Sequence, residues 1–158
     1  MTVDLKSISL RSAIPEDRAF IADTFLLALR ESITAARGSW DQERERTQFF
    51  RQLQMANTSV VQLAQLPVGF YTLLPSPNAL ELHTLCIVPL YQCCGIGGFV
   101  TQNLQRSATG AKQVLLLSVL KSNPRASSFY KKLGFVPIGE SEHHVRFQSP
   151  TLLGNSDA

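Results

Sequence analysis

The chain has 158 residues, of which 44% are hydrophobic and 17% are charged, and its formal net charge is +3. These values are typical of one soluble globular domain and argue against a disordered or fibrous protein. The charge is too small to indicate nucleic-acid binding, no apolar run is long enough for a membrane span, and the first residues lack a signal peptide's apolar core. We expect a cytoplasmic protein with no nucleic-acid or membrane partner.

The three cysteines, Cys86, Cys93 and Cys94, lack the CxxC spacing of a zinc site or a redox pair. Their odd number also argues against a disulfide framework. The simplest interpretation is three free thiols in a reducing compartment. No metal is implied.

The first half of the chain predicts a strand and two helices. Residues 7–13 are expected to form a strand, and residues 17–33 have the apolar periodicity of an amphipathic helix. A second helix is expected to begin at Ser39, because its hydroxyl and Gln42 have the spacing of a capping box. The charged run 41–46 is expected to be a solvated helix face.

The second half predicts a strand-rich region. The expected elements, in order, are strands 59–65, 68–74 and 80–88, a helix over 96–110, a strand at 113–120, a helix over 124–133 and a terminal hairpin, 135–140 with 143–148. The first three strands form an antiparallel meander, whereas a helical crossover makes strand 113–120 parallel to strand 80–88. We expect a single domain over residues 1–150 and a disordered tail over 151–158.

Three glycines, Gly95, Gly97 and Gly98, stand where the helix of residues 96–110 begins. A helix N-terminus presents unpaired N–H groups and a partial positive charge, and glycine lets an anion approach them closely. The turn also follows the carboxyl end of a strand, where ligands of α/β proteins bind. Val100 breaks a dinucleotide-binding GxGxxG pattern, and the Lys and Ser/Thr of a P-loop are missing.

The segment Gln92-Cys93-Cys94-Gly95-Ile96-Gly97 resembles the Q/R-x-x-G-x-G/A pyrophosphate loop of the GCN5-related N-acetyltransferase (GNAT) superfamily, which binds acetyl-coenzyme A. The resemblance extends over residues 7–148, and residues 123–135 resemble the family's fourth-helix segment. The chain departs from the family pattern at Gln92, where Arg is commoner, and at the two cysteines.

The resemblance implies an α/β (α+β) fold with a mixed, mostly antiparallel sheet of six or seven strands and helices on both faces. It also implies that strands 80–88 and 113–120 splay apart to admit the coenzyme, with the Val88 N–H polarising the thioester carbonyl. The implied coenzyme-binding residues are Cys86, Ile87, Val88, Gln92, Cys93, Cys94, Gly95, Ile96, Gly97, Gly98, Asn123 and Tyr130.

Tyr130 matches the family tyrosine that protonates the departing thiolate, although a core aromatic residue would also suit this helix position. Glu81 and His83 lie on one face of their strand by its two-residue period. Glu81 matches the base of some histone-type members and is our expected general base, while imidazole also accepts protons near neutral pH. The alternative is a strand-end glutamate and a hydrogen-bonded histidine.

The acceptor pocket implied by the family lies at the first two helices, with Arg30, Glu31, Trp40 and Tyr71 as candidates here. The predicted function is acetyl transfer from acetyl-coenzyme A to a primary amine of a small molecule or peptide, by direct attack in a ternary complex. The alternatives are a non-catalytic acetyl-coenzyme A-binding regulatory module and a transferase for a longer acyl group. The family also implies homodimers as a frequent state.

Overall fold

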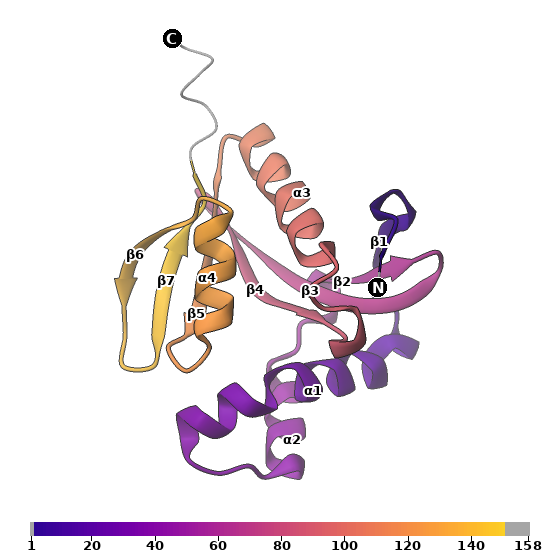
Figure 1. Ribbon diagram of the computed structural model, residues 1–158, viewed down its shortest axis with the longest axis vertical. Coiled ribbons are helices and arrows are strands. Elements are labelled where there is room, and N and C mark those ends of the chain that lie inside the picture. The colour runs from indigo at the N-terminus through magenta and orange to yellow at the C-terminus, as the bar shows by residue number, and fades with distance from the viewer. Residues whose placement is uncertain (1, 151–158) are drawn as a thin grey trace.

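The computed structural model describes residues 2–150, which form one seven-stranded sheet and four α-helices (Figure 1). The expected tail, residues 151–158, lies outside the described residues. The elements are β1 (Ile8–Ser12), α1 (Arg18–Arg37), α2 (Gln42–Gln52), β2 (Thr58–Leu63), β3 (Leu66–Ser76), β4 (Ala79–Ile87), α3 (Ile96–Gly110), β5 (Val114–Leu120), α4 (Pro124–Lys132), β6 (Val136–Glu140) and β7 (His144–Gln148). No helix in this part of the chain is long and apolar enough to cross a membrane.

The strand order is β1-β2-β3-β4-β5-β7-β6, which runs from right to left in Figure 1. Every neighbouring pair is antiparallel except β4 and β5, which are joined through α3 and run parallel. The structure therefore confirms the predicted mixed, mostly antiparallel sheet.

Helices cover both faces of the sheet, so each face has its own core. The core under α3 and α4 includes Tyr71, Leu82, Leu117 and Tyr130. The core under α1 and α2 is smaller and aromatic, with Phe49, Phe70 and Cys86 among its buried members. Figure 1 shows α1 and α2 together at the bottom of the view, separate from α3 and α4.

The corner between α1 and α2 differs from the sequence prediction. Helix α1 continues to Arg37 and ends where Gly38 adopts a left-handed conformation, with φ of 81°. The cap of α2 is Asp41, whose carboxylate accepts a 3.1 Å hydrogen bond from the Arg44 N–H. The expected start at Ser39 is wrong, because Asp41 is two residues closer to the first helical turn and also favours the helix dipole.

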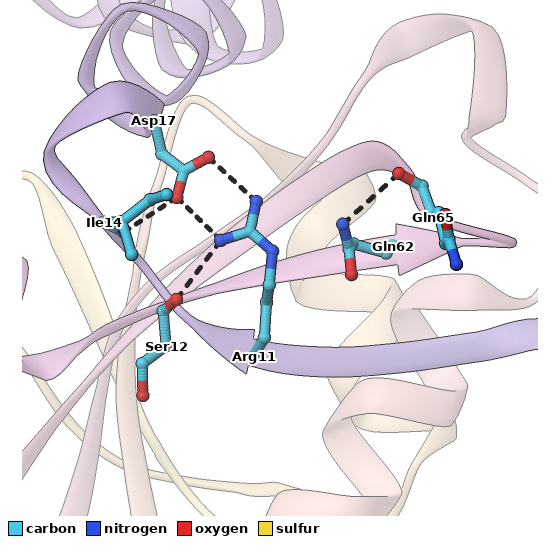
Figure 2. A network of polar contacts seen from close by, with 6 residues as sticks. All are labelled: Arg11, Ser12, Ile14, Asp17, Gln62 and Gln65. Carbon is cyan, nitrogen blue, oxygen red and sulfur yellow. Dashed lines mark hydrogen bonds and ion pairs between the residues drawn. The ribbon is translucent and has the colours of Figure 1, made fainter.

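An ion pair joins the first strand to the first helix. The guanidinium of Arg11 on β1 binds both oxygens of Asp17, just before α1, at 2.8 and 2.9 Å (Figure 2). The same carboxylate accepts a bond from the Ile14 N–H at 2.8 Å. Its pKa is lowered chiefly by the Arg11 hydrogen bonds, against the opposing effect of burial.

Strand β4 carries a bulge at His83. Thr84 pairs with Thr72 on β3 and Leu82 pairs with Leu73, so His83 is left without a partner residue on β3. On the other side, the parallel pairing with β5 ends at Leu82, although β4 itself continues to residue 87. A bulge increases local strand twist, so the extra residue directs the remainder of β4 away from β5.

Candidate active site

The pairing between β4 and β5 stops after Leu82 with Leu117, and the unpaired stretch between the two strands beyond it is called the opening below. Beyond this point β4 runs on to Ile87 and β5 to Leu120 without pairing to each other. The chain then passes from β4 through a short 3-10 turn, Pro89–Tyr91, into the glycine-rich loop and α3. The loop therefore follows directly on the strand that borders the opening.

The loop before α3 is sharply turned. Cys93 and Gly95 both have left-handed backbones, with φ of 61° and 88°. Gly95 is the N-cap residue of α3, and no side chain caps the helix. A Cβ on Gly97 would lie 3.3 Å from the Phe129 ring, whereas one on Gly98 would meet nothing within 4 Å. An uncapped helix N-terminus with little side-chain cover fits the oxygens of a diphosphate.

The polar side chains of the loop are partly used within the protein. The Gln92 amide donates to the Ile87 carbonyl at 3.0 Å and so ties the loop to the end of β4. Cys94 is half-buried, and its thiol lies 3.4 Å from the Gln92 carbonyl. The exposed Cys93 sulfur accepts from the Arg125 guanidinium at 3.4 Å. Arg125 is thus a positive charge beside the loop.

The main-chain groups that face the opening are not all those predicted. The Val88 N–H donates to the Val68 carbonyl on β3 at 2.8 Å, so it is turned away from the opening. Neighbouring residues of an antiparallel strand direct their N–H and C=O groups to opposite sides. The main-chain N–H and C=O groups of Cys86 therefore also point to β3, whereas those of Leu85 and Ile87 point to the opening. The predicted part of the Val88 N–H as the carbonyl-polarising group is therefore wrong, because that N–H is bonded within the sheet.

Tyr130 on α4 is buried, with 8% of its surface exposed, and its ring packs edge-on against Phe129 and Phe135. Burial, and secondarily the charge that Cys86 would carry, raises the pKa of the Tyr130 hydroxyl above its ordinary value. Burial likewise raises the pKa of the Cys86 thiol to about 12. The two residues belong to cores on opposite faces of the sheet, so the charge of a Cys86 thiolate would act on Tyr130 across it.

Glu81 is engaged by an arginine that the sequence analysis did not single out. Its two carboxylate oxygens accept from Arg146 on β7 at 2.7 and 3.1 Å. The Glu81 side chain is 24% exposed and that of Arg146 is 40% exposed. Arg146 lies between two apolar residues of β7, a pattern that could have marked it as a charged group needing a partner.

His83, the bulged residue, is exposed and borders a small cavity of about 40 Å³. The cavity lies between the two N-terminal helices and strands β3 and β4, and its lining residues are Phe25, Phe49, Gln52, Leu53, Gln54, Thr72, His83 and Thr84. The exposed imidazole is therefore accessible to a ligand on this face.

The four predicted acceptor-site residues are not all brought together. The Arg30 guanidinium lies 5.4 Å from the centre of the Trp40 ring, and the Trp40 indole N–H donates to Gln42. Glu31 is exposed on the same helix as Arg30. Tyr71, however, is buried in the core under α3 and α4, so its grouping with residues of α1 is wrong. The alternation of β3 puts Phe70, not Tyr71, towards α1 and α2.

Asn123 caps α4, as predicted from its place before Pro124. Its side-chain oxygen accepts from the Ala126 N–H at 3.2 Å. Helix capping alone accounts for an asparagine at this position. Its predicted contact with the coenzyme stays a prediction.

Comparison with protein families identifies the fold. The family model described as an acetyltransferase (GNAT) domain matches residues 55–137, more than half of the 158 residues. The chain therefore belongs to the GNAT acetyltransferase family. The matched region contains the opening, the glycine-rich loop and Tyr130, but not α1, α2 or β7. A comparison with curated proteins found no match.

Several solved structures have the same fold. The chain is similar to the apo form of YjaB from Escherichia coli, with 22% identity, a TM-score of 0.71 and coverage of 89% of this chain and 96% of that protein. An acetyltransferase from Thermus thermophilus has 23% identity, a TM-score of 0.69 and coverage of 95% and 99%. PaiA N-acetyltransferase from Thermoplasma acidophilum, solved in complex with coenzyme A, has 19% identity, a TM-score of 0.68 and coverage of 90% and 98%.

Proposed function

We propose that this protein transfers the acetyl group of acetyl-coenzyme A to a primary amine of a small molecule or peptide, by direct attack in a ternary complex. The observation that carries the proposal is the opening between β4 and β5 beside the uncapped start of α3, in a chain of the GNAT family. The similar PaiA structure contains coenzyme A, which supports the same ligand here.

The diphosphate would be bound by the main chain of the loop and the first turn of α3. Their N–H groups have no side-chain cap, and the helix dipole favours an anion at this end. Arg125 adds a positive charge beside Cys93. The side chain of Gln92 is bonded to Ile87, so its part is to hold the loop in shape.

The thioester would lie in the opening, where acetyl-coenzyme A supplies the carbonyl carbon that the amine attacks. Leu85 and Ile87 direct their N–H groups to this space, by the alternation that turns Val88 to β3. An N–H group held at the carbonyl oxygen stabilises the negative charge that develops there, a contribution of about 3 kcal/mol in comparable sites. The C–N bond forms and the C–S bond breaks.

Tyr130 would protonate the departing sulfur. Burial raises the pKa of its hydroxyl, so the phenol keeps its proton at neutral pH and can donate a hydrogen bond to the thiolate. Full transfer of the proton requires that the departing thiolate, desolvated in the same place, also has a raised pKa. The thiol of Cys86 is an unsuitable nucleophile, since a pKa of about 12 keeps it protonated. This supports direct attack by the amine over a covalent acetyl-cysteine route.

The proton of the amine would pass to His83, directly or through water. The geometry favours His83 over Glu81, because both oxygens of Glu81 are bonded to Arg146 while the imidazole borders the cavity under α1 and α2. His83→Ala should therefore lower kcat by about 10² or more. Glu81→Gln should lower kcat no further than Arg146→Gln does; a larger loss in Glu81→Gln would return the base role to Glu81.

The test is a free-thiol release assay on the purified protein with acetyl-coenzyme A and a panel of amines and peptides. Tyr130→Phe should lower kcat by about 10² or more, the usual scale of general-acid catalysis, and leave the Kd for coenzyme A close to that of the wild type. Coenzyme binding by calorimetry without thiol release from any amine would instead identify a non-catalytic module. Turnover only with longer acyl-coenzyme A would identify another acyl donor.

A further inference from the structure

One side chain of β7 reaches across β5 to β4. The Nη2 atom of Arg146 lies 2.7 Å from Oε1 of Glu81, and Nη1 lies 3.1 Å from Oε2. The same Nη1 is 3.3 Å from the hydroxyl oxygen of Ser118 on β5. A single guanidinium thus bonds to two strands besides its own, and bidentate pairs of this kind fix geometry well.

These three residues lie at the point where the opening begins. The last parallel pair is Leu82 with Leu117. Glu81 precedes that pair on β4 by one residue, and Ser118 follows it on β5 by one residue. We propose that Arg146 is a positioning residue that holds β4 and β5 together at the base of the opening and thereby sets where the acetyl group lies.

The parallel segment needs such a support because it is short. It has four residue pairs, and parallel pairing is slightly less stable per residue than antiparallel pairing. The bulge at His83 comes immediately after the last pair. Without Arg146, Glu81 would be a partly buried carboxylate with no partner. Exposing this carboxylate to water would then be favoured, and it would separate more of the β4–β5 pairing.

The kinetic consequence rests on the proposed function. The coenzyme's diphosphate would be bound at α3, at the other end of the site, so losing Arg146 should leave coenzyme binding unchanged. A loosened base of the opening would misplace the thioester, and a displacement of about 1 Å can lower the rate by about 10². Arg146 should therefore affect kcat rather than the KM for acetyl-coenzyme A.

The kinetic experiment compares Arg146→Gln, Glu81→Gln, the double variant and Arg146→Lys. Both single Gln variants should lower kcat about tenfold or more, and the double variant should be no worse than either, because all three lose the same contact. Arg146→Lys, which keeps one charged contact, should be intermediate. Arg11→Gln is the matched control, since it breaks a bidentate pair far from the opening; its kcat should equal that of the wild type.

Amide hydrogen exchange tests the same proposal without any turnover. Arg146→Gln should speed exchange at residues 115–118 of β5, while Arg11→Gln should not. Unchanged exchange there, or a KM effect without a kcat effect, would overturn the proposal. Faster exchange in a protein whose wild type acetylates no amine would support the role of Arg146 in the sheet and refute the proposed transferase instead.

Discussion

Adding a single carbon at Gly69 on β3 should destabilise the fold more than at any other described glycine. A Cβ there would lie 2.5 Å from the Cys86 carbonyl oxygen and 2.8 Å from Cδ1 of Ile87. An ordinary C···O contact is about 3.3 Å, so the shortfall is about 0.8 Å. The oxygen is main chain and cannot rotate away, so Gly69→Ala must push β3 and β4 apart next to the opening.

The size of the effect follows from two opposing contributions. Overpacking at a buried site costs about 1–3 kcal/mol, and the 0.8 Å shortfall against main chain favours the upper end of that range. Replacing glycine with alanine also removes about 0.4–1 kcal/mol of unfolded-chain freedom, which acts in the stabilising direction. We expect a net loss of about 2 kcal/mol, or about 4–8 °C in Tm for a chain of this size.

Urea denaturation followed by circular dichroism measures this loss. Gly139→Ala is the matched control, because Gly139 also lies in a strand but its Cβ would meet nothing within 4 Å. That variant should be neutral or more stable by about 0.5 kcal/mol. If Gly69→Ala and Gly139→Ala had the same free energy of unfolding, the inference of close main-chain approach would be incorrect.

Two further predictions concern titratable groups. Asp17→Asn should lower the free energy of unfolding by about 2 kcal/mol at pH 7, the scale of a charged hydrogen bond. Because the folded pKa of Asp17 is lowered, this loss should become smaller as the pH drops below about 4 and the wild-type carboxylate takes up a proton. A loss of unfolding free energy, measured by urea denaturation, that did not change with pH would contradict this. Iodoacetamide at pH 8 should label exposed Cys93 and spare buried Cys86, whose pKa is about 12. If mass spectrometry showed equal labelling of the two thiols in the native protein, Cys86 would not be buried as described.

Local sequence signals predicted the order of the elements and the glycine-rich turn before α3 well. Apolar periodicity, the Asn123 cap with Pro124 after it, and the glycines before α3 each depend on residues close together in the chain. The same signals placed the parallel pair, since a helical crossover between two strands leaves few other arrangements.

The errors arise where the conformation of one residue changes the geometry of the next. The sequence pattern of β4 contains no sign of the bulge at His83, and so no sign of where the strand leaves β5. The direction of the Val88 N–H depends on which residue of β3 it opposes, and this register is a tertiary property. Counting alternate positions back from the Val88–Val68 hydrogen bond shows that Leu85 and Ile87 direct their N–H groups away from β3.

Contacts between distant segments were also beyond the sequence analysis. Arg146 and Glu81 are 65 positions apart, and the strand order that brings them together places β7, not β6, beside β5. Tyr71 was misplaced for a related reason: both Tyr71 and Phe70 are buried, so hydrophobicity alone did not distinguish the two faces of β3.

The unpaired position of His83 has a consequence for how this site can change. Leu82 and Leu85 are directed to the same side of the sheet, with two residues between them where regular alternation allows one. Deleting His83 would leave every other side chain of β4 on its present side and remove the extra twist. The end of the β4–β5 pairing thus coincides with one extra residue in β4, so deletion of a single codon should extend the pairing while leaving the hydrophobic cores intact.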